Sequence, residues 1–368
     1  MDEKFYWYWL LNIENISSTE ISRAIGIYET PQNIFEGGHI GVLSEERNEA
    51  LKLARREADK YKASYDSLEA NGIQMVLRDD EIYPKKLVGI PDEPYGFFLR
   101  GKLPDFSKPS VAMVGARRAT HHGKYMAEHL AYDLAMEGVT VISGMAEGID
   151  GSSHIGALDG GGSTLAVLGS GIDVCYPPLH KALYERLIDC GGIISEYGPG
   201  APGLSFHFPL RNRIISALSD IVIVVEAREK SGSLITVSTA LTQGRDVMAI
   251  PGRPDDPGSV SCNRLIKEGA GCCTCAADVI KQLMTVSSSY NLTRKNTDQE
   301  NKKGKAGSFV QSDVQEMLIL SVLSGAPKHI EDISKETALD ITLVTIKLME
   351  MEIKGSVMKV TSGTYRKN

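Results

Sequence analysis

Four polar segments that follow apolar runs, two of them rich in glycine, contain the residues best suited to bind a ligand. The first is VGARRATHHG (114–123), in which Gly115 precedes Arg117 and Arg118, and Thr120 is placed to cap a helix. The free N–H groups at the start of a helix attract phosphate, and a neighbouring arginine adds to that attraction. This segment therefore predicts a phosphate contact.

The second segment is SGMAEGIDGSSHIGAL (143–158), which offers Gly144 and Gly148 together with Asp150 and His154. Four residues apart on a helix, the aspartate and the histidine would share one face. Such a pair can transfer protons, but it more often ties a loop to a helix by hydrogen bonds. We favour the structural interpretation of this pair.

The third segment, FHFPLRNRIISALSD (206–220), is the most basic of the four. Arg211 and Arg213 flank Asn212, and Phe208 lies just upstream. Guanidinium groups bind phosphates, while aromatic and amide side chains stack on exposed bases and bond to them. The arginines could instead bond neighbouring carboxylates and carbonyls. We favour a binding role because we interpret the stretch as a loop before a helix, where this composition adds no packing.

The fourth segment, EAREKSGSLIT (226–236), follows the longest apolar run and opens a helix. Its small hydroxyl residues and free N–H groups suit an oxyanion of phosphate. The residues concerned are Lys230, Ser231, Gly232, Ser233 and Thr236.

The spacing of these segments excludes the common nucleotide sites. No G-x-G-x-x-G follows the first apolar run, and no G-x-x-x-x-G-K-[ST] loop is present. Cys272, Cys273 and Cys275 contain one C-x-x-C spacing without a second pair, so we interpret them as small apolar filling of a buried strand rather than as a metal site. We expect neither a cofactor nor a metal.

Length and composition describe a multidomain protein. The chain has 368 residues, 42% of them hydrophobic, which allows two or three packed domains. The formal net charge of −7 argues against a generally basic nucleic-acid binder but leaves room for a local basic surface. The N-terminus is acidic and aromatic, the six cysteines suggest reduced thiols, and no apolar run approaches the roughly 20 residues that cross a bilayer. We expect a cytoplasmic protein with no membrane contact.

Six apolar runs alternate with helical patterns in the central part of the chain. Continuous apolar strands that alternate with helices predict a parallel sheet covered on both faces. We therefore expect an α/β fold with an extended Rossmann-like domain over residues 108–285, and ligands bound at the carboxyl ends of the strands. The runs cover residues 111–115, 139–144, 164–169, 192–196, 221–227 and 247–252.

Smaller modules are predicted on both sides of this domain. Residues 1–70 show helical patterns typical of a SAM or helix-hairpin-helix module, and the proline-containing residues 71–107 predict a connector packed on the core. Residues 286–308 are polar and charged, which predicts a flexible linker. Residues 309–368 show three helical patterns and a terminal hairpin, which predict a winged helix.

The predicted winged helix has little basic character. Its recognition stretch, Asp340 to Met351, carries Lys347 as its only base, with Glu350 and Glu352 nearby. Many such modules contact proteins rather than DNA, so DNA binding by this helix is disfavoured. A regulatory adaptor that acts through this module is one alternative function.

The glycine segments together resemble the DNA-processing protein A (DprA/Smf) family. The matching motifs are VGARRATHHG, SGMAEGIDGSSHIGAL, AVLGSGIDVCYP, FPLRNRIISALS and KSGSLITVSTALTQGRDVMAIPG, in this order. The resemblance is dense over residues 108–283 and faint in both terminal modules. It implies a Rossmann-like domain that binds single-stranded DNA, forms a homodimer and helps load RecA recombinase during natural transformation, without a catalytic step.

The motif positions of the family imply where DNA would bind. Family members often carry a basic residue shortly before the Phe-Pro pair, where this chain has Gly203-Leu204-Ser205, so Lys181 is a candidate replacement. His122 stands where a tyrosine is often found. The predicted DNA-binding residues are Gly115, Arg117, Arg118, Gly144, Gly148, Lys181, Phe208, Arg211, Asn212, Arg213, Lys230, Ser231, Gly232, Ser233 and Thr236.

The main alternative is an enzyme. Nucleotide or nucleoside hydrolases of the lysine-decarboxylase-like Rossmann group also bind phosphate with glycine loops, but they resemble G-G-x-G-T-x-x-E and use the glutamate in catalysis. In KSGSLITVSTA the corresponding position is Thr239 or Ala240, neither of them acidic. This difference argues against hydrolysis.

Overall fold

The computed structural model describes residues 1–13, 16–286, 319, 322–323, 327–337, 339, 341–353, 356–361 and 363–367. The chain divides into two compact units, Met1–Arg294 and Lys295–Asn368. Within the described residues, no helix combines the length and the apolarity needed to cross a membrane.

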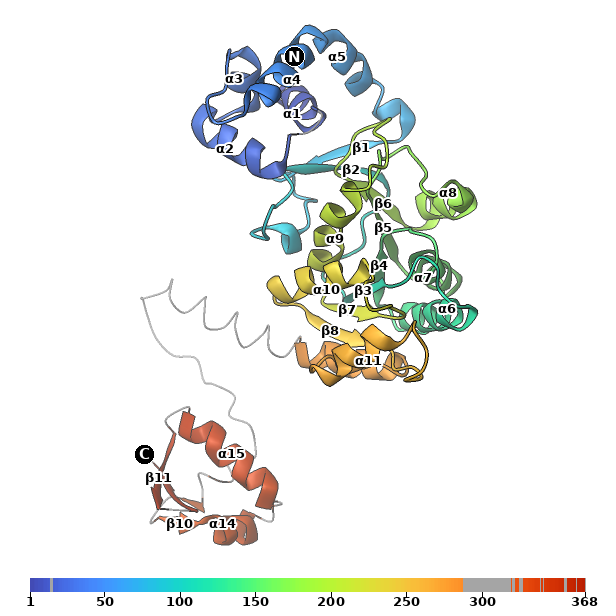
Figure 1. Ribbon diagram of the computed structural model, residues 1–368. Coiled ribbons are helices and arrows are strands. Elements are labelled where there is room, and N and C mark those ends of the chain that lie inside the picture. The colour runs from blue at the N-terminus through green and yellow to red at the C-terminus, as the bar shows by residue number, and fades with distance from the viewer. Residues whose placement is uncertain are drawn as a thin grey trace. The chain divides into compact units, whose positions relative to one another are not determined.

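A nine-stranded sheet forms the centre of the first unit, in the order β1-β2-β6-β5-β4-β3-β7-β8-β9 (Figure 1). Strands β5-β4-β3-β7-β8-β9 follow the order of a Rossmann sheet, and β6, β2 and β1 extend it beyond β5. All neighbours from β6 to β9 are parallel, whereas β2 is antiparallel to both β1 and β6. The bounds are Gln74–Leu77 (β1), Gly96–Gly101 (β2), Ser110–Val114 (β3), Thr140–Ser143 (β4), Thr164–Leu168 (β5), Gly192–Ser195 (β6), Ile221–Val224 (β7), Asp246–Ala249 (β8) and Gly271–Cys272 (β9).

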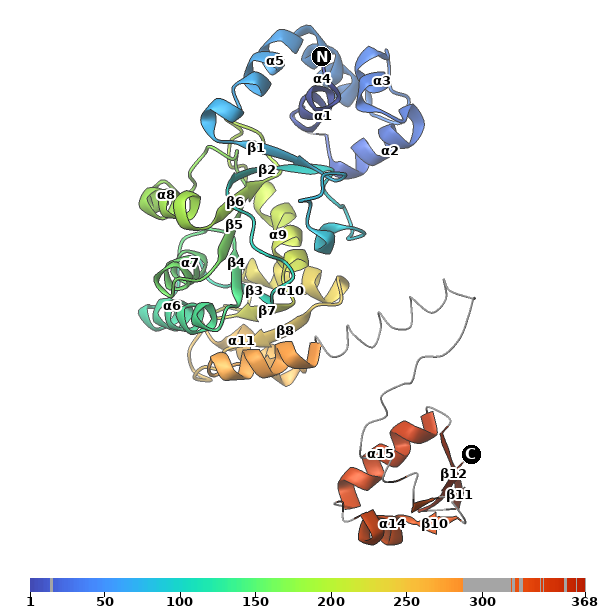
Figure 2. The same ribbon diagram turned by 180° about the vertical axis from the view of Figure 1, so that it is seen from behind.

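Helices cover both faces of this sheet (Figures 1 and 2). One face carries α6 (His121–Met136), α7 (Ile149–Asp159) and α8 (Lys181–Cys190), and the other carries α9 (His207–Leu218), α10 (Ser233–Thr242) and α11 (Val260–Lys267). The central strands β3, β4, β5 and β7 are buried along their whole length, as the continuous Val and Ile runs predict. The predicted α/β Rossmann-like fold is confirmed, and each of the six apolar runs contains one strand.

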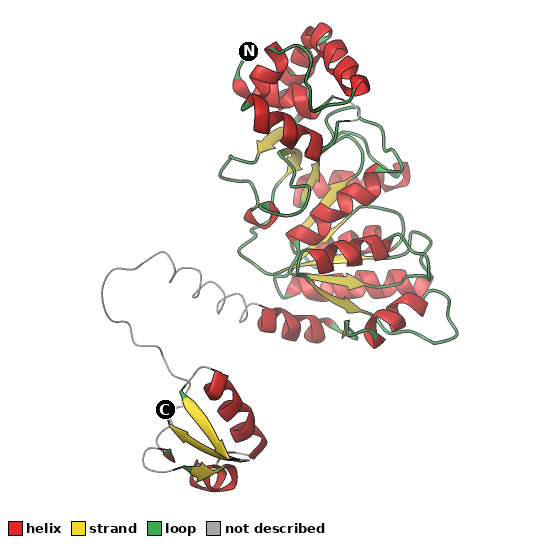
Figure 3. Ribbon diagram, turned by 60° about the vertical axis from the view of Figure 1, so that its left-hand side comes forward, coloured by secondary structure: helices red, strands yellow, loops and turns green. Residues whose placement is uncertain are grey.

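Five helices form the N-terminal module, as Figure 3 shows in red near the N-terminus. Their core contains the fully buried rings of Phe5 and Trp9. Tyr8 from the first helix packs edge-on against Phe98 of β2, so the module rests on the sheet extension. The helices are α1 (Glu3–Leu11), α2 (Ser18–Tyr28), α3 (Pro31–Glu36), α4 (Glu45–Arg56) and α5 (Ala58–Asp66).

The connector between module and core is more regular than the sequence indicated. Residues 71–107 contribute β1 and β2, which join the large sheet by antiparallel pairing. Both strands are short, and the segment between them contains three prolines, so their alternation was too brief to recognise. Single 3₁₀ turns lie at Glu69–Asn71, Lys85–Leu87 and Pro178–His180.

The cysteine interpretation was only partly correct. Cys273 is buried in the core, but Cys272 and Cys275 are exposed, because β9 is a two-residue strand at the edge of the sheet. Cys262 is buried in α11. No group of three or more His, Cys, Asp or Glu side chains that could hold a metal occurs among the residues the structure describes.

The second unit contains a small sheet and helices. Strands β10 (Lys328–His329), β12 (Thr364–Lys367) and β11 (Val357–Thr361) pair in that order, beside α14 (Ile330–Thr337) and α15 (Ile341–Ile353). The winged helix stays a prediction, because most of its first predicted helix lies outside the described residues. The predicted linker over 286–308 lies outside them too, except for Val286.

Close packing of α6 on α7 generates a stability prediction. A Cβ at Gly156 in α7 would overlap the carbonyl oxygen of Glu128 in α6. We expect Gly156→Ala to lower the free energy of unfolding by about 1–3 kcal/mol through overpacking. Gly26 in α2 has open space around it, so Gly26→Ala is the control and should raise stability by about 0.5–1 kcal/mol. Denaturant unfolding measures both, and equal effects would contradict the packing argument.

Candidate nucleic-acid interface

The loops that follow β3, β4 and β7 pack on one another at the carboxyl edge of the sheet. The N–H of Ile149 donates to the carbonyl of Ala116 at 3.3 Å, and the N–H of Ala116 donates to the carbonyl of Glu226 at 2.8 Å. Gly148 has a φ of 86°, and the carbonyl of Ala116 leaves no room for a Cβ there. A Cβ on Gly115 would lie 2.6 Å from Ile149 Cγ1. The glycines predicted as site residues therefore allow the loops to approach closely.

Glu226 fills the point at which the order of the sheet reverses, between β3 and β7. Its carboxylate accepts hydrogen bonds from the N–H of Thr120 at 3.0 Å and from the Thr120 hydroxyl at 2.7 Å. It also lies directly against Gly123, where a Cβ would overlap Oε2. Because Thr120 is the N-cap of α6, a protein carboxylate occupies the place of a dinucleotide pyrophosphate. The phosphate predicted at the start of α6 is thus replaced by Glu226.

Residues 207–218 form helix α9, not the loop that the sequence indicated. Both arginines of the third segment are consequently packed: Arg211 is 4% exposed and Arg213 is 8% exposed. The sequence argument failed here because the stretch contributes to the core through its helical face. Arg211 bonds to backbone carbonyls and Arg213 bonds to a carboxylate, which is the alternative that the sequence analysis disfavoured.

Arg211 lies directly beneath the loop after β4. Its Nη1 donates to the carbonyl of Gly144 at 2.7 Å and also to the carbonyl of Val167 in β5. The guanidinium lies within 2.6 Å of the Cβ that any other residue would carry at position 144. Burial lowers the pKa of Arg211 to about 10, and the buried carboxyl of Asp150 acts in the opposite direction. The charge therefore sits under the loop backbone rather than on the surface.

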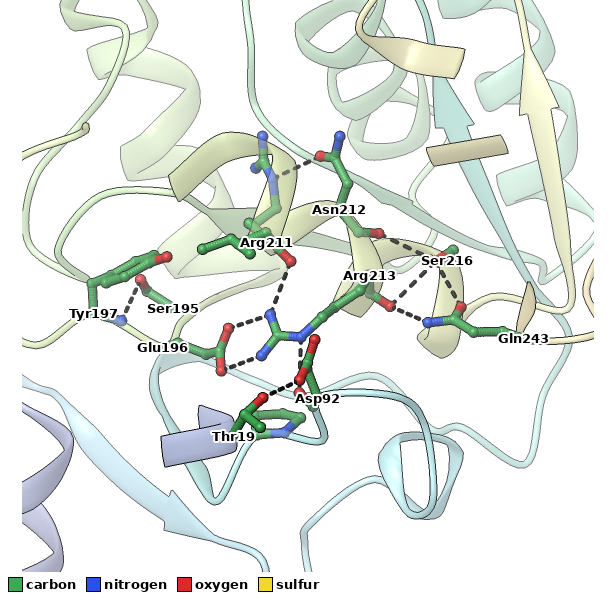
Figure 4. Close-up of polar contacts among 12 residues, drawn as sticks. Thr19, Asp92, Ser195, Glu196, Tyr197, Arg211, Asn212, Arg213, Ser216 and Gln243 are labelled. Atoms are coloured by element: carbon green, nitrogen blue, oxygen red, sulfur yellow. Dashed lines mark hydrogen bonds and ion pairs between the residues drawn. The ribbon is translucent and has the colours of Figure 1, made fainter. Parts of the chain in front are cut away.

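Arg213 points to the other side of α9, as Figure 4 shows. Its two terminal nitrogens donate to the two carboxylate oxygens of Glu196 at 2.6 and 2.7 Å. Burial would lower the pKa of Arg213, but Glu196 more than offsets this and the pKa is raised. Asn212, between the two arginines, is half-buried and accepts a bond from Arg211 Nε at 3.2 Å.

An exposed guanidinium and two aromatic rings form a continuous row at the strand ends. The Arg117 guanidinium carbon lies 5.2 Å from the centre of the Phe208 ring. The Tyr176 ring lies 5.3 Å from Phe208 on an interplanar angle of 32°. The Phe208 ring packs directly against Gly169 at the end of β5, where a Cβ would lie only 2.7 Å from the ring. We call Arg117, Phe208 and Tyr176 the Arg117 row.

Tyr176 was not among the predicted site residues. It is 44% exposed and follows β5 in the AVLGSGIDVCYP motif, so an exposed aromatic in a strand-end motif was the available signal. Leu179 and Phe206 are also exposed, at 64% and 51%. The row therefore has apolar surface open to solvent.

The remaining predicted residues are distributed around this edge. Arg118, Lys181 and Lys230 are exposed, and Gly232 is exposed in the loop after β7. The hydroxyls of Ser231 and Ser233 bond to each other at 2.8 Å. Ser233 and Thr236 are buried, because both lie in α10 where it faces the core. Among the described residues, no hydrogen bond or ring contact joins these side chains to the Arg117 row.

The Asp150 and His154 side chains do not form an acid–base pair. His154 Nδ1 lies 2.7 Å from the hydroxyl of Thr164, which itself donates to the carbonyl of Val141. The imidazole must therefore donate through Nδ1, and its buried Nε2 has no hydrogen-bond partner among the residues that the structure describes. Burial, with the charges of His180 and Arg211, lowers the pKa of His154 to about 3. The pair has the structural role that we favoured.

Two surface cavities lie away from the Arg117 row. One, of about 310 Å³, is lined by Thr19, Arg78 and Asp92, and the other, of about 260 Å³, is lined by Asp92, Leu210 and Arg213. Neither is lined by a residue of the Arg117 row.

Comparison with known proteins identifies the family. The model of the DNA recombination-mediator protein A family matches residues 74–284. The chain is 32% identical to the Smf protein of Escherichia coli over 335 residues, which cover 88% of this chain and 87% of that one. The chain belongs to this DNA-processing family. The DprA protein of Streptococcus pneumoniae is 44% identical to this family member over 203 residues, 55% of this chain and 72% of the relative.

Solved structures of family proteins share the fold of this family member. The X-ray structure of DNA processing protein A from Streptococcus pneumoniae has a TM-score of 0.67 and 33% identity, and covers 76% of this chain and 98% of its own. The Helicobacter pylori protein has a TM-score of 0.52 and 29% identity, and covers 58% of this chain and 96% of its own. That Helicobacter pylori structure was described for its single-stranded-DNA binding mode.

The buried His154 generates a prediction about acid stability. In the unfolded chain the His154 imidazole binds a proton near pH 6.5, whereas in the folded chain its pKa is about 3. The unfolded state therefore binds more protons between these two values, and the free energy of unfolding decreases as the pH falls from 6.5 towards 3. We expect this residue to remove about 1 kcal/mol of unfolding free energy between pH 7 and pH 5.5.

The test compares urea unfolding of the wild type and of His154→Asn at the two pH values. An asparagine amide can keep the bond to Thr164 but does not titrate, so its stability should fall less. Asp150, whose pKa burial raises, contributes with the opposite sign in both proteins and cancels in the comparison. Identical pH dependence in the two proteins would contradict the assignment.

Proposed function

We propose that this family member binds single-stranded DNA along the carboxyl edge of its sheet, with the Arg117 row as the centre of the site. The observation that carries this proposal is the exposed row itself, in which a guanidinium and two aromatic rings lie side by side. Arginine binds phosphate, and aromatic rings stack on unpaired bases of any sequence. In a duplex the faces of the bases are already stacked, so the row favours single strands.

The surrounding loops supply phosphate contacts. Arg118, Lys181 and Lys230 are exposed around the row, and the glycine loops present backbone N–H groups at the same edge. Separate phosphate sites on separate loops suit a chain of phosphates better than one nucleotide.

The buried arginines act indirectly in this proposal. Arg211 has two carbonyl partners, and its charge lies under the loop at Gly144 in a poorly hydrated environment. It makes that loop more attractive to an anion without touching it. Arg213 supports α9 through Glu196, and Asn212 is the residue of this segment with a partly open side chain.

The wider role follows from the family. We propose that the protein forms a homodimer through its Rossmann-like domain and protects incoming DNA in the cytoplasm. In this role it helps load RecA recombinase during natural transformation and recombination. The name recombination mediator supports this role, and so does the single-stranded-DNA binding of the Helicobacter pylori relative.

We propose a binding protein rather than a hydrolase. At the position of the hydrolase glutamate, Thr239 uses its hydroxyl to bond the carbonyl of Ile235 within α10. Glu226, the carboxylate at the sheet reversal, is already bonded to Thr120. Incubation with nucleoside monophosphates tests the alternative, and release of free base that Glu226→Gln abolishes would establish the enzyme instead.

The first binding prediction concerns Arg117. By fluorescence anisotropy, we expect Arg117→Ala to weaken binding of a single-stranded oligonucleotide about tenfold and to lower the log–log salt slope by about 0.7, the value for one lost phosphate contact. Arg56→Ala, which removes an exposed arginine from α4, is the matched control and should bind as the wild type does. Equal affinity of the wild type for single and double strands would refute the site.

The second binding prediction separates bases from phosphates. Tyr176→Ala should weaken binding by about 1–3 kcal/mol through the loss of one stacking ring, with an unchanged salt slope. Tyr176→Phe should retain affinity because the ring remains. On an abasic strand the wild type and Tyr176→Ala should bind alike, and a persisting difference there would show that Tyr176 does not contact bases.

A further inference from the structure

The loop between β1 and β2 links the N-terminal module to α9. Within this loop, Asp92 has a φ of 52°, which is uncommon for a residue other than glycine. Its carboxylate accepts a hydrogen bond from the hydroxyl of Thr19 at 2.5 Å, and its backbone carbonyl accepts one from Arg213 Nε at 2.9 Å (Figure 4). One residue therefore contacts the first turn of α2 on one side and the middle of α9 on the other.

Arg213 is rigidly connected on the α9 side. Two bonds join it to Glu196, just after β6, and a third runs from Nη1 to the carbonyl of Leu210 at 2.9 Å. Its own carbonyl accepts a bond from Gln243 Nε2 at 2.9 Å, beyond the end of α10. A displacement of Asp92 would therefore act on α9 through the Arg213 guanidinium.

Phe208 lies on the same helix, five residues before Arg213 and about 7.5 Å along its axis at 1.5 Å per residue. A small rotation or shift of α9 therefore moves the Phe208 ring relative to Arg117 and Tyr176. The Arg117 row depends on the position of this helix.

Little packing supports the loop at Asp92. The cavity of about 310 Å³ lies on its module side, and the cavity of about 260 Å³ lies on its α9 side, with Asp92 in the lining of both. Ile90 packs against the core and Glu93 pairs with Arg78, but open space adjoins Asp92 itself on both sides, so its hydrogen bonds contribute to where it lies.

We propose that Asp92 is a positioning residue that couples the N-terminal module to the DNA-binding end of α9. The Thr19–Asp92–Arg213 contacts, which we call the Asp92 latch, hold α9 so that Phe208 faces Arg117. This inference rests on the proposed DNA-binding function and assigns the N-terminal module a part in it. When the latch opens, DNA affinity falls although no DNA-contacting residue has changed.

Three substitutions separate the latch from backbone strain. Thr19→Val removes the hydroxyl and keeps the branched shape. Asp92→Gly removes the carboxylate but retains the carbonyl for Arg213 and suits the positive φ. Asp92→Asn keeps an acceptor oxygen for Thr19 and tolerates this φ, so it is the conservative rescue. If strain were the important property, Asp92→Gly would bind DNA at least as well as the wild type.

The control removes a different contact between module and connector. Lys4 in α1 pairs with Asp80 at 3.1 Å, and within the described part of the chain this pair forms no hydrogen bond to α9. Lys4→Met therefore loosens the module without touching the latch.

The experiment measures two quantities on the full chain. Hydrogen exchange of a peptide covering residues 204–212, without DNA, reports the opening of the start of α9, and anisotropy reports single-strand affinity. We expect Thr19→Val and Asp92→Gly to speed exchange and weaken affinity, each by about fivefold, the ratio expected for one lost hydrogen bond. Asp92→Asn and Lys4→Met should match the wild type in both.

The outcomes distinguish the two proposals. Unchanged exchange in Thr19→Val and Asp92→Gly overturns the latch, and so does faster exchange with unchanged affinity. A wild type that does not bind single strands overturns the proposed function instead. In that case the exchange data still show whether Asp92 positions α9.

Discussion

The buried guanidinium of Arg211 is the contact on which the strand-end surface depends. It joins α9 to the ends of β4 and β5 through the carbonyls of Gly144 and Val167. A buried charge is costly unless its donors are satisfied, so α9 can occupy few other positions. Phe208, one turn earlier in α9, is thereby set against Gly169 and beside Arg117 and Tyr176. A residue expected to touch the ligand instead positions those that are exposed to it.

The Glu226 carboxylate lies at the sheet reversal, where Rossmann folds commonly bind phosphate. The carboxylate bonds Thr120 at the start of α6 and leaves Gly123 no room for a side chain. A second anion at this point would be repelled, so a ligand must lie further out along the loops. The contacts of Glu226 therefore brace the loops at the sheet reversal.

Much of this arrangement was predictable from local patterns. The six apolar runs contain the central strands because a strand buried on both faces needs unbroken Val and Ile. The close loop approaches were foreseeable at Gly115, Gly144 and Gly148, since the absence of a Cβ is a local property. The strands β1 and β2 were missed because they are short and because β2, with which β1 pairs, joins the sheet through β6, far along the chain.

The sequence by itself determined the fold class and the absence of the common nucleotide-binding motifs, because periodicity and motif spacing are read over a few neighbouring residues. Only the tertiary structure decided which polar side chains are exposed. Arg117 and Arg211 both follow glycine-rich motifs, yet one lies in solvent over Phe208 and the other is sealed beneath Gly144. Exposure depends on how α9 packs against strands distant in sequence, and no local pattern contains that information.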